Sequence, residues 1–183
     1  MEHSGEVWQE LDYNGERLRG IKPTEFKVED VRLIYGAAVM LYRYKDGEVE
    51  FLFQHRSKLL KGNPDKWDAS AGGHVNLDEP QIKAVVREAK EEIGVDLDEK
   101  KLEFAVIYLR WMVVTGLYFY DWTGGSDEFK FNDDEVQEVR WVKYSEFDKF
   151  WPNLKRQVTE DKIFRYYLDE WNEKTLEKYR CDG

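Results

Sequence analysis

The sequence predicts an α/β domain built on a mixed β-sheet, and the order of its elements supports this fold class. Residues 31–56 carry the apolar and alternating patterns that are typical of two strands. One amphipathic helix follows at about residues 80–93, and further strand patterns occupy residues 102–142. An amphipathic helix from about residue 160 closes the order. Strands, one central helix, more strands and a closing helix indicate a layered domain in which helices cover a sheet.

The first predicted elements lie before residue 57. Residues 1–30 are polar and mixed, and Asn14-Gly15 is a strong turn signal that makes this segment a candidate hairpin. The run from Val31 to Tyr44 is largely apolar, and a turn follows at residues 45–47. The second strand then alternates with a period near two, with three apolar side chains at every other position: Val49, Phe51 and Phe53.

Residues 57–72 are predicted to form a loop because Gly and Pro recur in them. The helix that follows has a start and a stop signal, since Pro80 suits the first turn of a helix and Gly94 suits its end. Two strands are expected within residues 102–111 and 112–122.

The remaining elements lie beyond residue 123. Another strand is expected at residues 136–142, and a short helix begins at Ser145. The last helix carries apolar side chains on one face, at Ile163, Phe164, Tyr167, Leu168 and Trp171.

These elements predict one domain with additional segments at its ends. The domain spans residues 31–150, residues 1–30 form an N-terminal extension, and residues 151–183 contribute a C-terminal helix packed on the same domain. Residues 1–30 and 144–183 are candidates for contacts in a homodimer or for a lid, and the sequence leaves both open.

The composition excludes several classes of protein. The 183 residues carry a net charge of -10, which disfavours general binding to nucleic acid because phosphate backbones would be repelled. Cys181 is the one cysteine, so no disulfide can form within the chain and a cysteine-built zinc site is disfavoured. No basic and apolar leader and no apolar run long enough to cross a membrane is present. We therefore expect a cytoplasmic protein that does not bind membranes.

Three carboxylates on the central helix carry the chemical signal. At about 100° per residue, Glu88, Glu91 and Glu92 share one flank of the helix. The buried stripe on the other side is predicted to consist of Ile82, Val85, Val86, Ala89 and Ile93.

An exposed acidic surface is one interpretation of this flank, and a metal site is the other. The three carboxylates lie near the negative end of the helix dipole, and unpaired they would repel one another. A bound divalent cation would remove that repulsion, and hard oxygen ligands suit Mg²⁺ or Mn²⁺.

The stretch from Gly73 to Val95 resembles the Nudix box. That box consists of Gly, five residues, Glu, seven residues, and then Arg-Glu-apolar-X-Glu-Glu-X-Gly-apolar. Its fixed positions are all met, at Gly73, Glu79, Arg87, Glu88, Glu91, Glu92 and Gly94. Chance agreement is on the order of one in a million at ordinary residue usage. The resemblance implies the Nudix α/β/α sandwich with a mixed β-sheet.

The resemblance also implies a role for each matching position. Glu88, Glu91 and Glu92 look like metal ligands for Mg²⁺ or Mn²⁺, together with the backbone carbonyl of Gly72. Arg87 is expected to orient the glutamates through ion pairs, and Glu79 to support the site. Gly73 and Gly94 are expected to serve the backbone geometry.

A second, weaker resemblance covers about residues 6–143. The pattern from Gln54 through Trp67 to His74 is similar to that of Nudix proteins related to type 1 isopentenyl-diphosphate isomerase. Arg56 and Lys61 are candidate contacts for the diphosphate, with exposed surface cations as the alternative. Those isomerases carry a catalytic cysteine where this chain has Gly72, and they depart from the complete box. Both differences favour hydrolysis.

Several other side chains have open roles. His74 is a candidate contact for the substrate phosphate or an ordinary hydrogen-bonded loop histidine. Glu135 is the first candidate for a general base supplied by the loop before the strand at residues 136–142, and Glu138 is the second. Aromatic side chains that are candidates for stacking on a nucleobase, but that more often belong to the core, are Trp67, Trp111, Tyr118, Tyr120 and Trp122.

The predicted function is Mg²⁺-dependent hydrolysis of a diphosphate linkage in a nucleoside-diphosphate-X or a similar organic diphosphate. Glu91 or Glu135 is the expected proton acceptor. The partner is a small-molecule diphosphate. Two alternatives remain: an enzyme like the isopentenyl-diphosphate isomerases, and a non-catalytic module that binds a diphosphate. The second is disfavoured because every glutamate of the box is present.

Overall fold

The computed structural model describes residues 5–12, 14–25, 33–110, 112–131, 134–154 and 162–181. Its strands are β1 (Trp8–Leu11), β2 (Arg17–Ile21), β3 (Leu33–Lys45), β4 (Glu48–Arg56), β5 (Trp67–Asp68), β6 (Ala71–His74), β7 (Glu103–Arg110), β8 (Val113–Asp121) and β9 (Val136–Lys143). Its α-helices are α1 (Gln81–Ile93), α2 (Phe147–Phe150) and α4 (Lys162–Cys181). Short 3-10 turns are η1 (Pro23–Glu25), η3 (Glu99–Lys101), η4 (Tyr144–Glu146) and η5 (Trp151–Asn153).

The strand β3 is the centre of a mixed sheet. It pairs in parallel with β8 and antiparallel with β1, β4 and β6. The sheet continues through β4 to β5 and β9, and through β8 to β7. The predicted α/β fold with a mixed sheet is confirmed.

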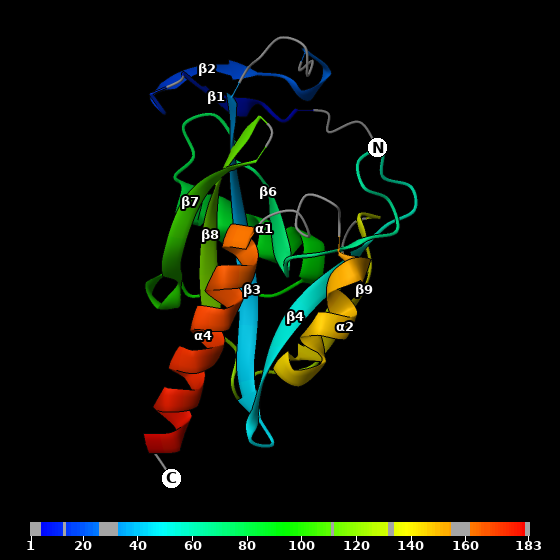
Figure 1. The fold of residues 1–183 in the computed structure, drawn as a ribbon. Coiled ribbons are helices and arrows are strands. Elements are labelled where there is room, and N and C mark those ends of the chain that lie inside the picture. Colours follow the sequence, from blue (N-terminus) through cyan, green and yellow to red (C-terminus); the bar gives the residue numbers. More distant parts are fainter. Residues whose placement is uncertain are drawn as a thin grey trace.

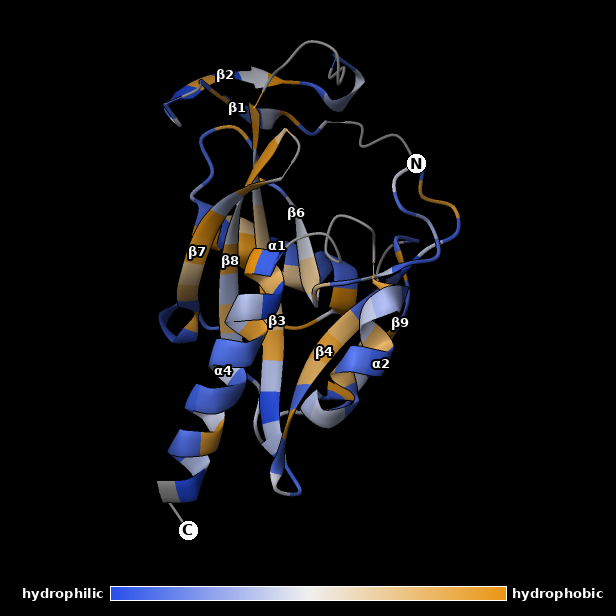
Figure 2. Ribbon diagram, viewed as in Figure 1, coloured by the Kyte–Doolittle hydropathy of each residue, from blue (hydrophilic) through white to orange (hydrophobic). Residues whose placement is uncertain are grey.

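Helices cover both faces of this sheet, as Figure 1 shows: α4 and α2 lie on one face and α1 on the other. Two apolar cores result, and Figure 2 shows hydrophobic residues concentrated along the strands between them. Phe51, Phe119 and Trp171 lie in the core under α4, while Val39, Leu52 and Val85 lie in the core under α1. Because side chains alternate along a strand, β3 and β4 supply residues to both cores.

The N-terminal segment forms a ribbon at one end of the sheet (Figure 1). Its strands β1 and β2 pair antiparallel on either side of Asn14-Gly15, and Gly15 has a φ of 82° that suits glycine in a turn. At the other end of the chain, α4 buries Phe164, Leu168 and Trp171 against the domain. No helix in the described residues is both long and apolar enough to cross a membrane.

The central helix has the predicted limits. Pro80 lies at the position before α1 with an extended backbone, and Gly94 ends the helix in the left-handed region with a φ of 72°. A side chain at Gly94 would meet the backbone of Lys130, so the small residue also allows the next loop to pack closely.

Two details of the prediction were wrong. Residues 57–72 are not all loop, because β5 lies within them and β6 begins at Ala71. Both strands are short, and β6 contains two glycines. Pairing with β4 and β3, rather than an apolar pattern, determines them. The buried face of α1 is also rotated: Ile82 and Val86 are only partly buried, while Ala84 and Glu92 are inside.

Candidate active site

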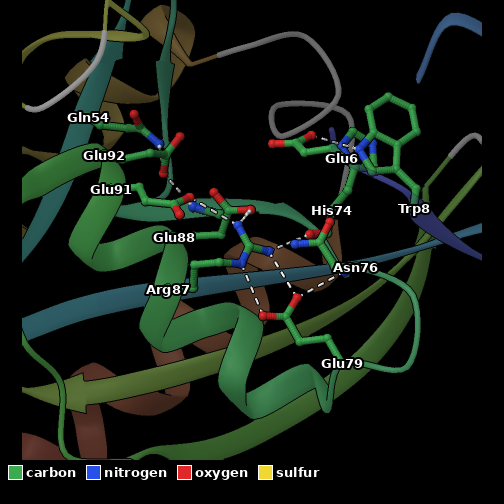
Figure 3. Close-up of polar contacts among 11 residues, drawn as sticks. Glu6, Trp8, Gln54, His74, Asn76, Glu79, Arg87, Glu88, Glu91 and Glu92 are labelled. Carbon is green, nitrogen blue, oxygen red and sulfur yellow. Dashed lines mark hydrogen bonds and ion pairs between the residues drawn. The ribbon is translucent and has the colours of Figure 1, made fainter. Parts of the chain in front are cut away.

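The candidate site lies where α1 crosses β6 and the loop that follows it. Figure 3 shows Glu88, Glu91 and Glu92 projecting from α1 toward this loop, with Arg87 among them. The strand β6 approaches α1 closely because Gly72 and Gly73 have no side chains. A Cβ at Gly73 would overlap the carboxylate of Glu88. The glycine pair therefore makes the space into which the carboxylates project.

Glu92 is the most buried carboxylate of the site, with only 3% of its surface exposed. Its Oε2 accepts hydrogen bonds from the backbone N–H of Gly72 at 2.8 Å and from Nε2 of Gln54 at 3.1 Å. Burial raises the pKa of Glu92 well above its ordinary value, and the neighbouring Glu88 raises it further. Among the described residues, no salt bridge reaches this carboxylate.

Glu88 lies between Glu92 and the loop, and 14% of its side chain is exposed. Burial raises its pKa to about 7, although the ion pair with Arg87 acts in the opposite direction. Charge repulsion from Glu91 and Glu6 contributes to the same rise. Both neighbouring carboxylates thus have raised pKa values, and added positive charge would favour their ionised forms.

Arg87 joins three carboxylates of the box to one another. Its guanidinium contacts Glu79 at 3.0 Å, Glu88 at 2.8 Å and Glu91 at 3.1 Å, and also donates to the carbonyl of His74 at 2.9 Å. This fork needs several donors in one plane, which a lysine side chain does not have. The structure therefore brings together Arg87, Glu79, Glu88 and Glu91.

Glu79 connects Arg87 to the loop before α1. Its Oε1 and Oε2 both accept hydrogen bonds from Arg87, and Oε2 also accepts the backbone N–H of Asn76 at 2.9 Å. Within the same loop, Asp78 has a φ of 62°, a left-handed backbone that Asp tolerates better than most residues. Glu79 thus fixes the loop to the helix.

The two predicted cationic contacts differ in their surroundings. Arg56 lies at the end of β4 and donates a hydrogen bond to the carbonyl of Gly62 at 3.2 Å. Its positive charge lowers the pKa of Glu92. Its Nε is buried, and no atom of the described residues accepts a hydrogen bond from it. Lys61 is exposed, and no hydrogen bond or ion pair reaches it from the described part of the chain. Of these two cations, Arg56 is the one whose charge lowers the pKa of Glu92.

His74 stacks its ring on Trp8, with 3.7 Å between ring centroids and 18° between ring planes. Its backbone carbonyl accepts a hydrogen bond from Arg87. Figure 3 shows this pair on the far side of Arg87 from Glu92, with Glu6 beside Trp8. The site therefore includes residues of the N-terminal segment.

The two candidate bases have different surroundings. Glu135 precedes β9 and accepts the backbone N–H of Ser57 through its carbonyl at 2.7 Å, so it lies next to Arg56. Glu138 pairs with His55 at 3.1 Å, and His55 stacks on Trp67 above Phe150 in the core opposite α1. Glu138 therefore points away from the glutamates of α1.

The aromatic residues that could have stacked on a base mostly serve the cores. Trp67 packs on Phe150, while Tyr118 and Tyr120 are buried under α1. Trp122 packs against the core under α1, and its Nε1 donates to the carbonyl of Ser126. Trp111 lies outside the described residues.

Sequence reasoning assigned no role to Gln54 or to the N-terminal residues Gln9 and Trp8. The alternation of β4 does place Gln54 on the same face as Leu52, which is the face toward α1, so the period of the strand was a usable signal. The positions of Gln9 and Trp8 beside the site depend on how the N-terminal ribbon packs over the loop. No local pattern indicates that packing.

The donor set fits a hard divalent cation. Carboxylate oxygens and a backbone carbonyl are the ligands that Mg²⁺ and Mn²⁺ accept. In the described residues, no three His, Cys, Asp or Glu side chains surround a single point, and Arg87 pairs with two of the glutamates. Within the described parts of the chain, Glu92 has no ion pair, and Oε1 of Gln54 beside it is buried without a hydrogen-bond partner. Both features leave a place for positive charge.

Comparison with known proteins decides the family. The NUDIX domain family matches residues 33–166, which is most of the chain. The chain belongs to the NUDIX domain family. Its fold is similar to the crystal structure of DR0079 from Deinococcus radiodurans, with a TM-score of 0.69 and 18% identity, covering 87% of this chain and 98% of that one.

Curated relatives of this Nudix chain are named as hydrolases. An uncharacterized Nudix hydrolase of Listeria innocua is 28% identical over 75% of this chain and 79% of its own length. Nudix hydrolase 3 of Arabidopsis thaliana is 25% identical over 63% of this chain, and the match spans 17% of that protein. The predicted family is confirmed, and these relatives support an enzyme that acts as a pyrophosphohydrolase.

Proposed function

We propose that this Nudix chain hydrolyses a diphosphate linkage in a nucleoside-diphosphate-X or a similar organic diphosphate, in a Mg²⁺- or Mn²⁺-dependent reaction. One observation carries the proposal. The buried Glu92 and its neighbour Glu88 face the glycine pair of β6, and the nearby cationic side chains do not offset the rise that burial causes in their pKa values. A divalent cation would supply the missing positive charge, and the diphosphate would bind through that cation.

Glu88, Glu91, Glu92 and the carbonyl of Gly72 would hold the cation. When bound, it supplies positive charge that neutralises diphosphate oxygens and lowers the pKa of a water molecule. Glu92 is already oriented for this role by Gly72 and Gln54, whereas Glu88 and Glu91 must exchange part of their contact with Arg87. Arg87 and Glu79 would keep the helix and loop in register during that exchange.

The residues of the chain would bind the diphosphate and accept the proton. Arg56 would hold a phosphoryl oxygen, which is supported by its effect on the pKa of Glu92 and by its Nε, which has no hydrogen-bond partner among the described residues. Glu91, with 51% of its side chain exposed, or Glu135, beside Arg56, would take the proton from the attacking water. His74 and Lys61 would contact the substrate farther from the reacting phosphorus.

The isomerase alternative has less support. A cysteine at the position of Gly72 would be needed, and a Cβ there would lie 2.7 Å from the carbonyl oxygen of Ala37 and 2.9 Å from Cα of Ala38. Those neighbours are backbone atoms of β3, so the strand would have to move. This position of β6 therefore favours glycine.

A panel of diphosphates tests the proposal. Nucleotide sugars, dinucleotides, nucleoside triphosphates and isopentenyl diphosphate are each incubated with Mg²⁺ or with a chelator, and the release of phosphate or a nucleoside monophosphate is measured. We expect cleavage of at least one organic diphosphate that depends on the cation. Conversion of isopentenyl into dimethylallyl diphosphate without phosphate release would support the isomerase instead. Tight binding with no turnover of any compound would support a binding module.

A further inference from the structure

The ribbon of β1 and β2 lies outside residues 33–166, which match the NUDIX domain, yet it packs directly on the loop that carries Glu79. In Figure 3, Trp8 of this ribbon lies beside His74 and Asn76 at the edge of the site. The stacked rings of Trp8 and His74 are one contact. Backbone hydrogen bonds make the others.

The first strand of the ribbon is hydrogen-bonded to the loop on both sides of Trp8. The N–H of Gln9 donates to the carbonyl of Val75 at 2.9 Å, and the N–H of Leu77 donates to the carbonyl of Val7 at 2.7 Å. The loop therefore pairs with β1 as a short additional strand would. Its path between β6 and α1 depends on where β1 lies.

Gln9 makes the most specific connection between the ribbon and the loop. Its side chain is fully buried, with 0% exposed. Its Nε2 donates to the carbonyls of Glu10 at 3.0 Å and Leu18 at 3.2 Å, and its Oε1 accepts the N–H of Asp78 at 3.2 Å. One amide thus ties both strands of the ribbon to the residue before Glu79, where the backbone is left-handed.

Two further contacts hold the same loop. Nη2 of Arg17 donates to the carbonyl of Glu79 at 2.8 Å. A Cβ at Gly20 would overlap Val7 and approach Leu77, so the ribbon and the loop are in close contact there. The ribbon therefore reaches the loop from both of its strands.

We infer that the N-terminal ribbon is part of the active site and that Gln9 is a positioning residue, which holds Asp78 and through it the pair of Glu79 with Arg87. Because Arg87 in turn contacts Glu88 and Glu91, a shift of the loop is transmitted to two carboxylates of the site. The inference rests on the proposed function, since it assigns to Gln9 an effect on the same hydrolysis.

The test replaces Gln9 by methionine, which has a similar length and cannot accept the N–H of Asp78. We expect kcat to fall about tenfold with little change in KM, because small displacements of catalytic groups have effects of this order. Arg17→Ala, at an exposed position, removes the contact to Glu79 with little risk to folding and should lower kcat in the same direction.

A double-mutant cycle separates positioning from general loss of stability. If Gln9 acts through Glu79, the variant Gln9→Met/Glu79→Gln has the same kcat as Glu79→Gln alone. Tyr144→Phe removes a hydrogen bond to Asp169 on the opposite face of the sheet and serves as the control, with a lower melting temperature and unchanged kcat. The inference would be overturned if the losses of kcat in the cycle were additive. It would also be overturned if Gln9→Met and Arg17→Ala both kept a kcat within twofold of wild type.

Magnesium binding measured by calorimetry gives a second readout that does not need turnover. Gln9→Met should weaken the binding of Mg²⁺ about threefold or more, because Glu88 and Glu91 are displaced with Arg87. A wild-type chain that cleaves no diphosphate refutes the proposed function alone, and the magnesium affinities then decide the role of Gln9. Equal affinities in wild type and Gln9→Met would overturn that role.

Discussion

The carboxylate of Glu92 accepts the backbone N–H of Gly72 at 2.8 Å, which links the last turn of α1 to the glycine strand β6. Although a glutamate late in an amphipathic helix would ordinarily face water, this one is buried under the strand. The cost of burying a carboxylate without a cation is high, so its place indicates a role that needs it.

Replacement of Glu92 by glutamine keeps its shape and removes its charge. We expect kcat/KM for a diphosphate substrate to fall by at least 10²-fold, or about 3 kcal/mol of transition-state stabilisation. The melting temperature of the metal-free variant should equal or exceed that of wild type because the glutamine side chain cannot ionise in this buried position. Steady-state kinetics and a thermal melt measure both quantities. Near-normal turnover would refute the ligand role of Glu92.

Gly73→Ala tests the space for Glu88. The new Cβ would overlap the carboxylate of Glu88, so the side chain must turn away and activity should fall at least about tenfold. Gly62→Ala is the matched control, since a Cβ there meets no atom within 4 Å. Comparable activity of the two variants would show that the position of Glu88 does not matter.

Arg87→Lys keeps the charge and loses the planar fork. We expect about 10–100-fold lower activity, because an ammonium group cannot contact Glu79, Glu88 and Glu91 together. Lys90→Arg on the same helix is the control, since Lys90 pairs with Asp96 away from the site. If Arg87→Lys had an activity close to that of wild type, only the positive charge of Arg87 would matter, and not its planar shape.

The two candidate bases can be separated by comparing Glu91→Gln with Glu135→Gln. The true base should show a kcat lowered by about 10²-fold and a loss of the acidic limb of its pH–rate profile. The other variant should retain that limb. Glu173→Gln on α4 controls for loss of a surface charge. If both profiles keep the acidic limb, neither residue accepts the proton.

The pKa of Glu88 predicts how the metal-free protein responds to pH. Its folded-state pKa is raised from 4.5 to about 7, so the folded state holds a proton that the unfolded state has released. The contribution of protonated Glu88 to the stability of the folded state is fully present below pH 4.5 and is lost as the pH rises through about 7. In a chelator, the melting temperature of wild type should therefore decline over this window relative to Glu88→Gln. A constant difference between the two proteins would contradict the shift.

Much of the fold follows from local patterns. The limits of α1 could be predicted because Pro80 and Gly94 act locally, and the strands β7 and β8 follow apolar runs. The short strands β5 and β6 could not, since they form only by pairing with β4 and β3. Propensity says little about such segments.

The candidate site, like the fold, could be predicted only in part from the sequence. The spacing of Glu88, Glu91 and Glu92 predicts that they share one flank of a helix, and they do lie together. Helical geometry alone did not predict that Glu92 is buried, because the glycines of β6 decide how α1 is rotated. The contacts of Gln9 with the loop depend on packing between distant segments, which no periodicity records.

Direct titration of the cation tests the central claim. Mg²⁺ and Mn²⁺ are titrated into wild type and into Glu88→Gln/Glu92→Gln by calorimetry, with and without inorganic phosphate. We expect saturable binding to wild type and at least about tenfold weaker binding to the double variant. Equal affinities, or no binding to wild type in either condition, would contradict the assignment of these carboxylates as the metal site.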